Sequence, residues 1–264
     1  MNVDYIKCGD SALLMQELPD DCIDLTVTSP PYDNLRKYNG YSFDFETIAK
    51  QLYRVTTRGG VLVWIVSDGV ENGSETGTSF RQALYFKECG FNLHDTMIWE
   101  KDSFNFPEVN RYAQNFEYMF ILSKGTPKTF NPIEDRKNKF AGTKIHGTFR
   151  NKDGTITSIR EKWKDSTCKE YGKRLNVWQL PAEKTNKTDH PAVFPKRLAA
   201  DHIVTWSNEK DVVFDPFLGS GTTALAAREL NRHFIGFEIS KEYFEDTKKR
   251  IDAVQSQMML WDFI

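Results

Sequence analysis

Two glycines and one acidic residue have the spacing of a nucleotide-type cofactor site. Gly219 and Gly221 lie in DVVFDPFLGSGTTALAARELN, where strand-like residues give way to helix-like ones. Without side chains there, a ligand can approach the backbone and the exposed N–H groups that begin a helix. Glu238 ends the next strand-like segment, seventeen residues after Gly221, where a carboxylate can accept hydrogen bonds from both hydroxyls of a ribose. The pattern predicts a cofactor that contains a nucleoside.

The glycine pattern has other readings. Gly219, Gly221 and Ala224 also fit the dinucleotide pattern G-x-G-x-x-[GA], which would favour NAD. A dinucleotide fold that began here would need several more βα units, whereas only one strand and one helix follow. A P-loop is excluded because no Gly-Lys-[Ser/Thr] follows the glycines. A plain tight turn stays open as the non-functional alternative.

A second candidate site follows the strand-like run DLTVTSPPYDNL at residues 24–35. Pro30 and Pro31 cannot donate the hydrogen bonds that would extend a strand, so the strand must end there. Proline also favours an extended conformation in the residue before it, which gives a stiff backbone around Ser29 and holds Tyr32 just beyond the strand. Ligands of open α/β sheets bind at this edge, although a Pro-Pro pair also fits a loop that only blocks strand extension.

The elements that position these residues alternate between strand and helix patterns. Strands are predicted at residues 3–8, 24–29, 59–68, 211–217 and 232–239, and helices at 11–18, 45–56, 78–90, 195–207, 222–231 and 241–255. The runs 91–101 and 116–125 predict an antiparallel pair at a sheet edge. Alternation of this kind predicts an α/β fold with a mostly parallel, doubly wound sheet. The apolar run MMLWDFI at 258–264 is expected to dock on the body.

The middle of the chain has a different composition. Residues 124–175 contain 14 Lys+Arg and 6 Asp+Glu, whereas the remainder contains 21 and 31. From residue 126 to 188 the hydrophobic periodicity fades, and at most short strands are expected. We therefore predict three segments: 1–125, a basic inserted region at 126–188, and 189–264. The excess of positive charge predicts that the insertion binds a polyanion, with a flexible solvated loop as the alternative.

Composition excludes several other classes of protein. With 264 residues, of which 39% are hydrophobic, the chain can bury a sizeable core. No apolar run is long enough for a membrane span, and MNVDYIKCGD does not resemble a secretory signal, so we expect a cytoplasmic protein. The four cysteines are scattered without a CxxC pair, which predicts no metal site and no disulfide framework.

Together these motifs resemble a known family. FDPFLGSG looks like the S-adenosylmethionine-binding loop of amino-group DNA methyltransferases, and TSPPY looks like their catalytic [DNS]-P-P-[YFW] motif. The motif order resembles the permuted β class, as do IKCGD at 6–10, HPAVFPKRL at 190–198 and FIGFEIS at 234–240. The resemblance implies a circularly permuted, Rossmann-like methyltransferase fold. It places target recognition in the basic insertion, where no motif matches.

The resemblance also implies a chemistry that these residue types can perform. The exocyclic amine of a base is a poor nucleophile, because its lone pair is delocalised into the ring. The Ser29 side chain and the Pro30 carbonyl can each accept one N–H, which favours a pyramidal nitrogen. Tyr32 would stack on a base flipped out of the duplex. Carbon-5 methylation would need a Pro-Cys pair, and the sequence has none.

Individual roles follow from the resemblance, position by position. The catalytic residues are Ser29, Pro30, Pro31 and Tyr32. The cofactor-binding residues are Asp10, Ser29, Phe194, Lys196, Asp215, Phe217, Gly219, Ser220, Gly221, Thr222 and Glu238, while His190 and Pro191 equally fit a plain loop. The DNA-binding residues are Arg111, Lys137, Lys139, Arg150, Arg160 and Lys164. The polar neighbours Asn110, Tyr112, Gln114 and Asn115 lie in the connection between the two strands of the predicted pair.

The resulting hypothesis is a sequence-specific DNA methyltransferase that uses S-adenosyl-L-methionine and flips its target base out of double-stranded DNA. Serine before Pro-Pro resembles the cytosine-N4 branch more than the adenine-N6 branch. Methylation of RNA or of a protein glutamine stays open, as do an NAD-linked oxidoreductase and a non-catalytic nucleic-acid-binding domain. The sequence does not decide between a monomer and a homodimer, nor whether a companion restriction endonuclease exists.

Overall fold

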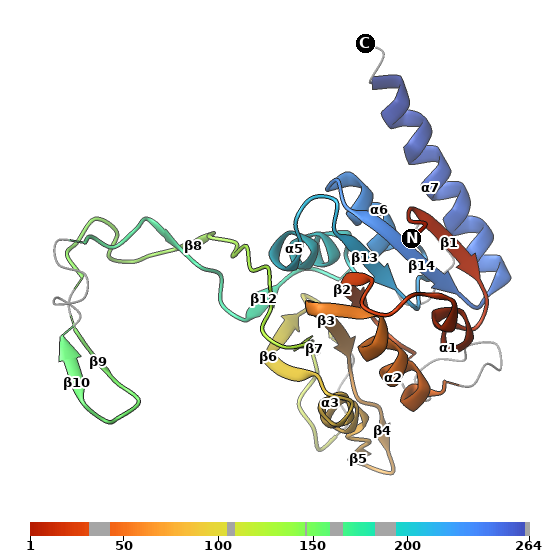
Figure 1. The fold of residues 1–264 in the computed structure, drawn as a ribbon. Coiled ribbons are helices and arrows are strands. Elements are labelled where there is room, and N and C mark those ends of the chain that lie inside the picture. The colour runs from red at the N-terminus through yellow and green to blue at the C-terminus, as the bar shows by residue number, and fades with distance from the viewer. Residues whose placement is uncertain (32–42, 105–108, 146, 159–165, 183–193, 262–264) are drawn as a thin grey trace. The chain divides into compact units, whose positions relative to one another are not determined.

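The computed structural model describes residues 1–31, 43–104, 109–145, 147–158, 166–182 and 194–261, the residues from 255 on by their backbone alone. The chain divides into two compact units (Figure 1). The sheet unit comprises Met1–Asn131 and Asn176–Ile264, and the inserted unit comprises Pro132–Leu175. Within the described residues, none of the helices combines the length and apolar character needed to cross a membrane.

An eight-stranded sheet forms the centre of the sheet unit, in the order β1-β14-β13-β2-β3-β7-β6-β12. The strands are β1 (Tyr5–Cys8), β2 (Ile23–Thr28), β3 (Thr56–Val66), β6 (Asn92–Glu100), β7 (Phe116–Ser123), β12 (Val177–Gln179), β13 (Val212–Asp215) and β14 (His233–Glu238). Every neighbouring pair is parallel except the two that involve β7. The carboxyl ends of all the other strands therefore meet at one edge, as the predicted α/β fold requires.

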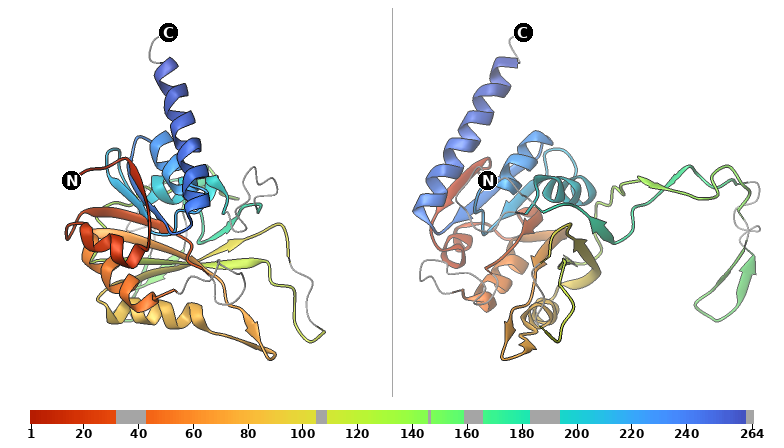
Figure 2. Two further views of the ribbon diagram at one scale, coloured as in Figure 1. Left: turned by 90° about the vertical axis from the view of Figure 1, so that its right-hand side faces the viewer. Right: turned by 180° about the vertical axis from the view of Figure 1, so that it is seen from behind.

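Helices cover both faces of this sheet (Figures 1 and 2). One face is covered by α1 (Ser11–Leu14), the 3-10 turn η1 (Met15–Glu17), α2 (Phe45–Val55) and α3 (Thr78–Glu88), and the other by α5 (Lys196–Trp206), α6 (Thr222–Glu229) and α7 (Lys241–Trp261). Side chains of a strand alternate between faces, so in β3 Val63 packs on the α5–α6 side and Trp64 on the α2–α3 side. This double burial explains the uninterrupted apolar run of β3.

The structure corrects two details of the predicted sheet. The pair β6–β7 does not end the sheet, because β12 from the predicted insertion adds in parallel beyond β6. Only three residues form β12 and only Trp178 among them is buried, which is too short a pattern to identify in the sequence. The strand β3 begins at Thr56 rather than Gly59, because the register with β2 shifts there and Gly59 sits inside the strand with φ of 79°.

The inserted unit has little regular structure. Its strands form two short antiparallel ladders, β8 (Arg136–Lys137) with β11 (Tyr171–Gly172), and β9 (Thr148–Arg150) with β10 (Ile156–Ser158). The amide of Arg174 donates to the carbonyl of Ile133 at 2.8 Å, so the two ends of this unit lie side by side. The expectation of short strands at best is confirmed for the described part of this unit.

At the C-terminus, α7 continues to Trp261, beyond the predicted end at residue 255. The predicted docking of Met258–Ile264 concerns side chains that lie outside the described residues.

Candidate active site

The carboxyl edge of the sheet brings the two predicted motifs together. Ser29 follows β2 and the glycine loop (residues 218–221) follows β13, and these two strands are parallel neighbours. The Thr28 hydroxyl donates to Oδ1 of Asp215 at 2.7 Å, directly joining the last residue of β2 to the last residue of β13. Ser29 and Gly219 therefore lie on the same rim of the sheet.

The glycine loop is a tight turn with a backbone conformation that favours glycine at two positions. Gly219 and Gly221 have positive φ values of 49° and 81°, and the amide of Gly221 donates to the carbonyl of Leu218 at 2.9 Å. A Cβ on Gly221 would lie 2.6 Å from the γ-methyl carbon of Thr247 on α7. The turn is therefore fixed by its own hydrogen bond and by close packing, and it leads directly into α6.

Glu238 supports this turn from the end of β14. Its side chain is only 7% exposed, and its two oxygens accept from the amides of Gly219 at 2.7 Å and Ser240 at 2.8 Å. Burial raises the pKa of the Glu238 carboxyl, and hydrogen bonds from backbone amides oppose that effect. Each carboxylate oxygen has a second lone pair, so the ribose contact stays a prediction beside this structural role.

Asp215 is a second buried carboxyl group at this edge. It is 2% exposed and also accepts from the amide of Phe217 at 3.0 Å. Burial raises its pKa to about 6, against the opposing hydrogen bonds from Thr28, Thr223 and the Phe217 amide. Two buried carboxyls beside one turn make this edge a favourable place for a cationic ligand.

Asp10 and Ser11 extend the edge to β1. Cys8 is paired with Glu238 in the parallel register, and the Gly9 amide donates to the Glu238 carbonyl at 2.9 Å. Asp10 is exposed and caps α1 by accepting from the amide of Ala12 at 2.7 Å. The Ser11 hydroxyl donates to the carbonyl of Pro216, so this corner is tied to the chain just before the glycine loop.

The remaining predicted cofactor residues have less direct positions. The ring of Phe217 packs edge-on against Phe43, with centroids 5.5 Å apart, and Phe194 is half-buried on the α5–α6 side of the core. Ser220 and Thr222 are buried, with their hydroxyl oxygens 3.2 Å apart. Lys196 forms an ion pair with Glu229, the last residue of α6, whereas the glycine loop precedes the first. That contact does not bring the Lys196 ammonium group to the loop.

The predicted catalytic segment Ser29–Tyr32, which we call the proline corner, is described as far as Pro31. Ser29 and Pro31 are half-buried, Pro30 is buried, and all three follow β2 without regular structure. Tyr32 lies outside the described residues, as do His190 and Pro191.

The predicted DNA-binding residues fall into two groups. Lys137, Lys139 and Arg150 are exposed in the inserted unit, whereas Arg160 and Lys164 lie outside the described residues. In the sheet unit, Arg111 donates to the carbonyl of Gly73 and lies 3.9 Å from Glu75, and the Gln114 amide donates to the Ser67 hydroxyl. The connection between β6 and β7 is thus anchored to the chain that follows β3. Tyr112 is fully exposed, Asn110 is exposed and the Asn115 carbonyl accepts from the Lys101 amide.

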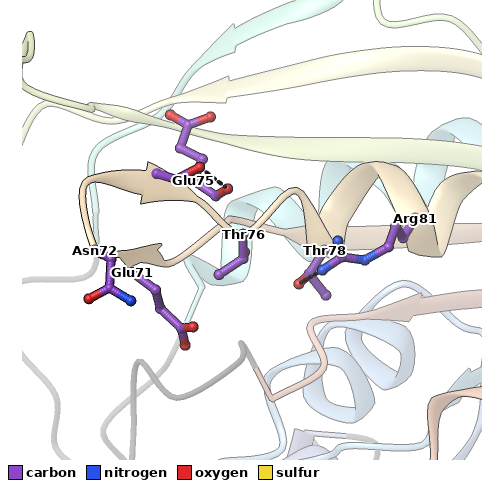
Figure 3. A pocket seen from close by; sticks show the side chains of 7 residues that line it. Glu71, Asn72, Glu75, Thr76, Thr78 and Arg81 are labelled. Atoms are coloured by element: carbon purple, nitrogen blue, oxygen red, sulfur yellow. Dashed lines mark hydrogen bonds between the residues drawn. The ribbon is translucent and has the colours of Figure 1, made fainter.

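Sequence reasoning missed the hairpin to which Arg111 binds. It consists of β4 (Val70–Glu71) and β5 (Ser74–Glu75), joined by Asn72 and Gly73 with φ values of 51° and 78°. An Asn-Gly pair with positive φ is the usual signal of a two-residue hairpin, so the sequence did contain the evidence. A polar surface pocket adjoins the hairpin and the start of α3 (Figure 3). Its lining residues are Glu71, Asn72, Ser74, Glu75, Thr76, Thr78 and Arg81.

Two residues of α7 were also missed. The Thr247 hydroxyl donates to the carbonyl of Gly219 at 2.6 Å, and the Arg250 guanidinium donates to the carbonyl of Ser220. The sequence carries no local signal for either contact, because the partners lie 28 and 30 residues apart. Among the described residues no cluster of His, Cys, Asp and Glu could hold a metal ion.

Solved DNA methyltransferases share this fold. A structure of the PvuII DNA methyltransferase (cytosine-N4-specific) superposes with a TM-score of 0.67 at 21% identity, covering 94% of this chain and 86% of that one. A complex of M1.HpyAVI with S-adenosylmethionine superposes with a TM-score of 0.61 at 24% identity, covering 93% and 98%. The predicted Rossmann-like methyltransferase fold is confirmed.

The sequence comparison identifies the family. The model of the DNA methylase family of N6 and N4 methyltransferases matches residues 23–249, so the chain belongs to this family. It is 58% identical over 246 residues to the orphan methyltransferase M.BamHII of Bacillus amyloliquefaciens, covering 90% of this chain and 92% of that protein. It is 26% identical over 261 residues to the type II methyltransferase M.ScaI of Streptomyces caespitosus, covering 93% and 80%.

Family membership confirms the predicted class of enzyme, a DNA methyltransferase of the N4/N6 group, and supports S-adenosyl-L-methionine as its cofactor. It decides against the NAD-linked oxidoreductase and the non-catalytic nucleic-acid-binding domain.

Proposed function

We propose that this chain transfers the methyl group of S-adenosyl-L-methionine to the N4 amine of a cytosine that is flipped out of double-stranded DNA at a specific site. One observation carries the proposal: the proline corner and the glycine loop meet at one edge of the sheet through the Thr28–Asp215 hydrogen bond. A single cleft can then hold the acceptor amine and the methyl donor in line, which is the geometry that direct transfer needs.

The cofactor half of the site fits a ligand with a positive charge and a nucleoside. When bound, S-adenosylmethionine supplies a methyl carbon activated by its sulfonium group. Asp215 and Glu238, both with raised pKa values, favour a cation nearby because it stabilises their ionised forms. The exposed carboxylate of Asp10 and the glycine loop offer further polar contacts to the same ligand. These residues bind and orient the cofactor, and none of them needs to exchange a proton with the substrate.

The part of the site that binds the acceptor amine depends on a rigid backbone. In our proposal the Ser29 side chain and the Pro30 carbonyl each accept one N–H of the amine, which localises its lone pair toward the methyl carbon. Pro30 is buried and Pro31 follows it, so the two acceptors stay fixed relative to each other. The bond from Thr28 to Asp215 fixes the end of the strand that carries them.

The preference for cytosine rests on two observations. Serine precedes Pro-Pro in this chain, and the PvuII methyltransferase that shares the fold is described as cytosine-N4-specific. Adenine N6 is the second candidate, because the same acceptor geometry can serve its amine. The experiment is to incubate unmethylated plasmid with the protein and S-adenosylmethionine, digest the DNA to nucleosides and identify the modified base by mass spectrometry. N4-methylcytosine is expected; N6-methyladenine in its place would overturn the assignment of the base, and the absence of both modified bases would overturn DNA methylation.

DNA recognition is assigned to the inserted unit. Its exposed Lys137, Lys139 and Arg150 suit phosphate contacts, which position a protein on DNA without reading its sequence. Some relatives are type II methyltransferases, whereas M.BamHII is described as an orphan. A companion restriction endonuclease therefore stays a prediction, as does the choice between a monomer and a homodimer.

The substitution Ser29→Ala tests the role of the proline corner. We expect kcat for methyl transfer to fall by about 100- to 1000-fold, the usual effect of removing one fixed polar group that stabilises a transition state. The affinity for S-adenosylmethionine, measured by calorimetry, should stay within about twofold of wild type, because Ser29 accepts from the substrate amine. Wild-type turnover in this variant would refute the role of Ser29.

A further inference from the structure

The helix α7 contacts the glycine loop through two side chains on one of its faces. Thr247 and Arg250 lie three residues apart, so both point to the same side of the helix. Thr247 is 1% exposed and donates to the carbonyl of Gly219 at 2.6 Å, while Arg250 donates to the carbonyl of Ser220. Two successive carbonyls of the turn are thereby held toward α7.

These bonds determine where the opposite sides of the peptide groups point. A trans peptide is planar, and its N–H points opposite to its carbonyl. Because Thr247 holds the Gly219 carbonyl, the Ser220 amide must point away from α7. The amides of Gly219 and Gly221 already donate to Glu238 and Leu218. Within the described part of the chain the Ser220 amide has no acceptor, although Ser220 is only 6% exposed.

A backbone amide without an acceptor in a buried turn costs free energy unless a ligand accepts its hydrogen bond. Its surroundings point to the cofactor, since the same turn is flanked by Asp215 and Glu238. Thr247 also packs against Gly221, where even a Cβ would come within 2.6 Å of its methyl carbon. The turn therefore cannot relax toward α7 and direct the Ser220 amide elsewhere.

The position of Arg250 also has a cost in free energy, because its charge is partly removed from water. It is half-buried, and desolvation lowers the pKa of its guanidinium group. Among the described residues no carboxylate forms an ion pair with it, and its hydrogen bond goes to the Ser220 carbonyl. A charged donor binds a carbonyl more strongly than a neutral one, so this contact fixes the second peptide of the turn.

We propose that Thr247 and Arg250 are positioning residues that hold the turn at Gly219–Gly221 so that the Ser220 amide donates to S-adenosylmethionine, which makes α7 a part of the cofactor site. This inference rests on the proposed function of the turn as the cofactor loop.

The test compares the affinity of variants for S-adenosylmethionine by calorimetry. Thr247→Val removes the hydroxyl but keeps the branched shape, and we expect the dissociation constant to rise about tenfold, as for one lost hydrogen bond. Thr247→Ser keeps the hydroxyl and should stay within about twofold of wild type. Arg250→Met should weaken binding to a similar extent as Thr247→Val, with Arg250→Lys in between, because an ammonium group can still donate to a carbonyl.

Arg228→Met is a matched control for a merely structural effect. Arg228 on α6 donates to the Ile251 carbonyl of α7 at 2.9 Å, so it joins α6 to α7 without contacting the glycine loop. We expect this variant to lower Tm but to leave cofactor affinity unchanged. In steady-state assays, Thr247→Val should raise KM for S-adenosylmethionine while kcat at saturating cofactor and KM for DNA stay near wild type.

The outcomes are distinguishable. Wild-type affinity in Thr247→Val, or an equal loss of affinity in Arg228→Met, would overturn the positioning role. If the wild-type protein itself does not bind S-adenosylmethionine, the proposed cofactor loop fails first. A measurement on the wild-type protein covers the case that a variant does not fold: the 15N–1H resonance of Ser220 should shift when cofactor is added, and an unchanged resonance in the bound protein would overturn the inference.

Discussion

The sheet unit and the inserted unit are stabilised in different ways. In the sheet unit large side chains such as Trp64, Phe86 and Phe214 are fully buried between helices and strands. The described strands of the inserted unit have two or three residues, and Phe140 and Ile156 are 71% and 64% exposed. Local hydrogen bonds replace a core there, for example from the side-chain amide of Asn151 to the hydroxyls of Thr155 and Thr157.

The contrast fits the two tasks that we propose for these units. Methyl transfer needs groups that are fixed in space, and buried carboxyls such as Asp215 and Glu238 can be held only by a packed framework. Contact with a polyanion needs exposed positive charge, and residues 132–175 contain 12 Lys+Arg against 6 Asp+Glu, whereas the rest of the chain contains 23 against 31. The following experiments separate the two tasks.

The largest effect is expected when the inserted unit is removed. Residues 134–173 would be replaced by a short Gly/Ser linker, because the ends at Ile133 and Arg174 are already joined by a hydrogen bond. Site-specific methylation should fall by about a thousandfold or more, the usual ratio between specific and non-specific DNA binding. Cofactor affinity should stay within about twofold of wild type. Methylation would be measured by transfer of a labelled methyl group and affinity by calorimetry.

A shuffled insertion of the same length and composition is the control for charge alone. It keeps the Lys and Arg residues but not their arrangement. If it restores methylation at the specific site, then the structure of the inserted unit has no role in recognition. If the deletion variant loses cofactor binding although its Tm is near wild type, the separation of the two tasks is wrong.

The same contrast explains how much could be predicted from the sequence. The sheet unit follows from long patterns: the apolar run of β3 and the alternating strands and helices specify an α/β fold. The convergence of Ser29 and Gly219 also follows, because parallel strands share one carboxyl edge. The strand β12 was missed because three residues with one buried tryptophan do not form a recognisable pattern.

Contacts between side chains of distant elements could not be predicted. The ion pair of Lys196 with Glu229 depends on how α5 packs against α6, and Thr247 and Arg250 depend on how α7 packs against the glycine loop. Glu238 was predicted as a cofactor residue from its place at a strand end, but its bonds to the amides of Gly219 and Ser240 arise from the folded turn. Motifs thus predict where the candidate site lies, whereas packing determines which contacts each side chain makes.

An intermediate effect is expected for Asp215→Asn in the sheet unit. The Asn side chain keeps an oxygen that accepts from Thr28 and from the Phe217 amide, so the variant mainly removes the charge. The native pKa of Asp215 is about 6, above its ordinary value of 3.8, so the folded state binds more protons than the unfolded state between these values. Wild-type stability should therefore fall as pH rises from about 4 to about 6, by up to about 3 kcal/mol.

The variant should lack this pH-dependent loss, so above pH 6 the free Asp215→Asn protein should be more stable than the free wild-type protein. Unfolding by denaturant at several pH values measures this difference. Wild-type affinity for S-adenosylmethionine should increase as pH rises through about 6, because an ionised carboxylate favours the sulfonium group. The affinity of the variant should not follow this titration. A parallel pH dependence in both proteins would show that Asp215 is not the titrating group.

The smallest effect is expected for single charges of the inserted unit. Arg150 is exposed on β9, and Arg150→Ala should lower DNA affinity by only a fewfold while reducing the slope of log K against log salt by about 1. Lys50→Ala is the matched control, because Lys50 is also exposed but lies on α2 of the sheet unit. The slope for the control should equal that of the wild type. Equal slopes for all three proteins would mean that Arg150 does not neutralise a phosphate, whereas a loss confined to the cognate sequence at unchanged slope would indicate that it reads a base edge instead.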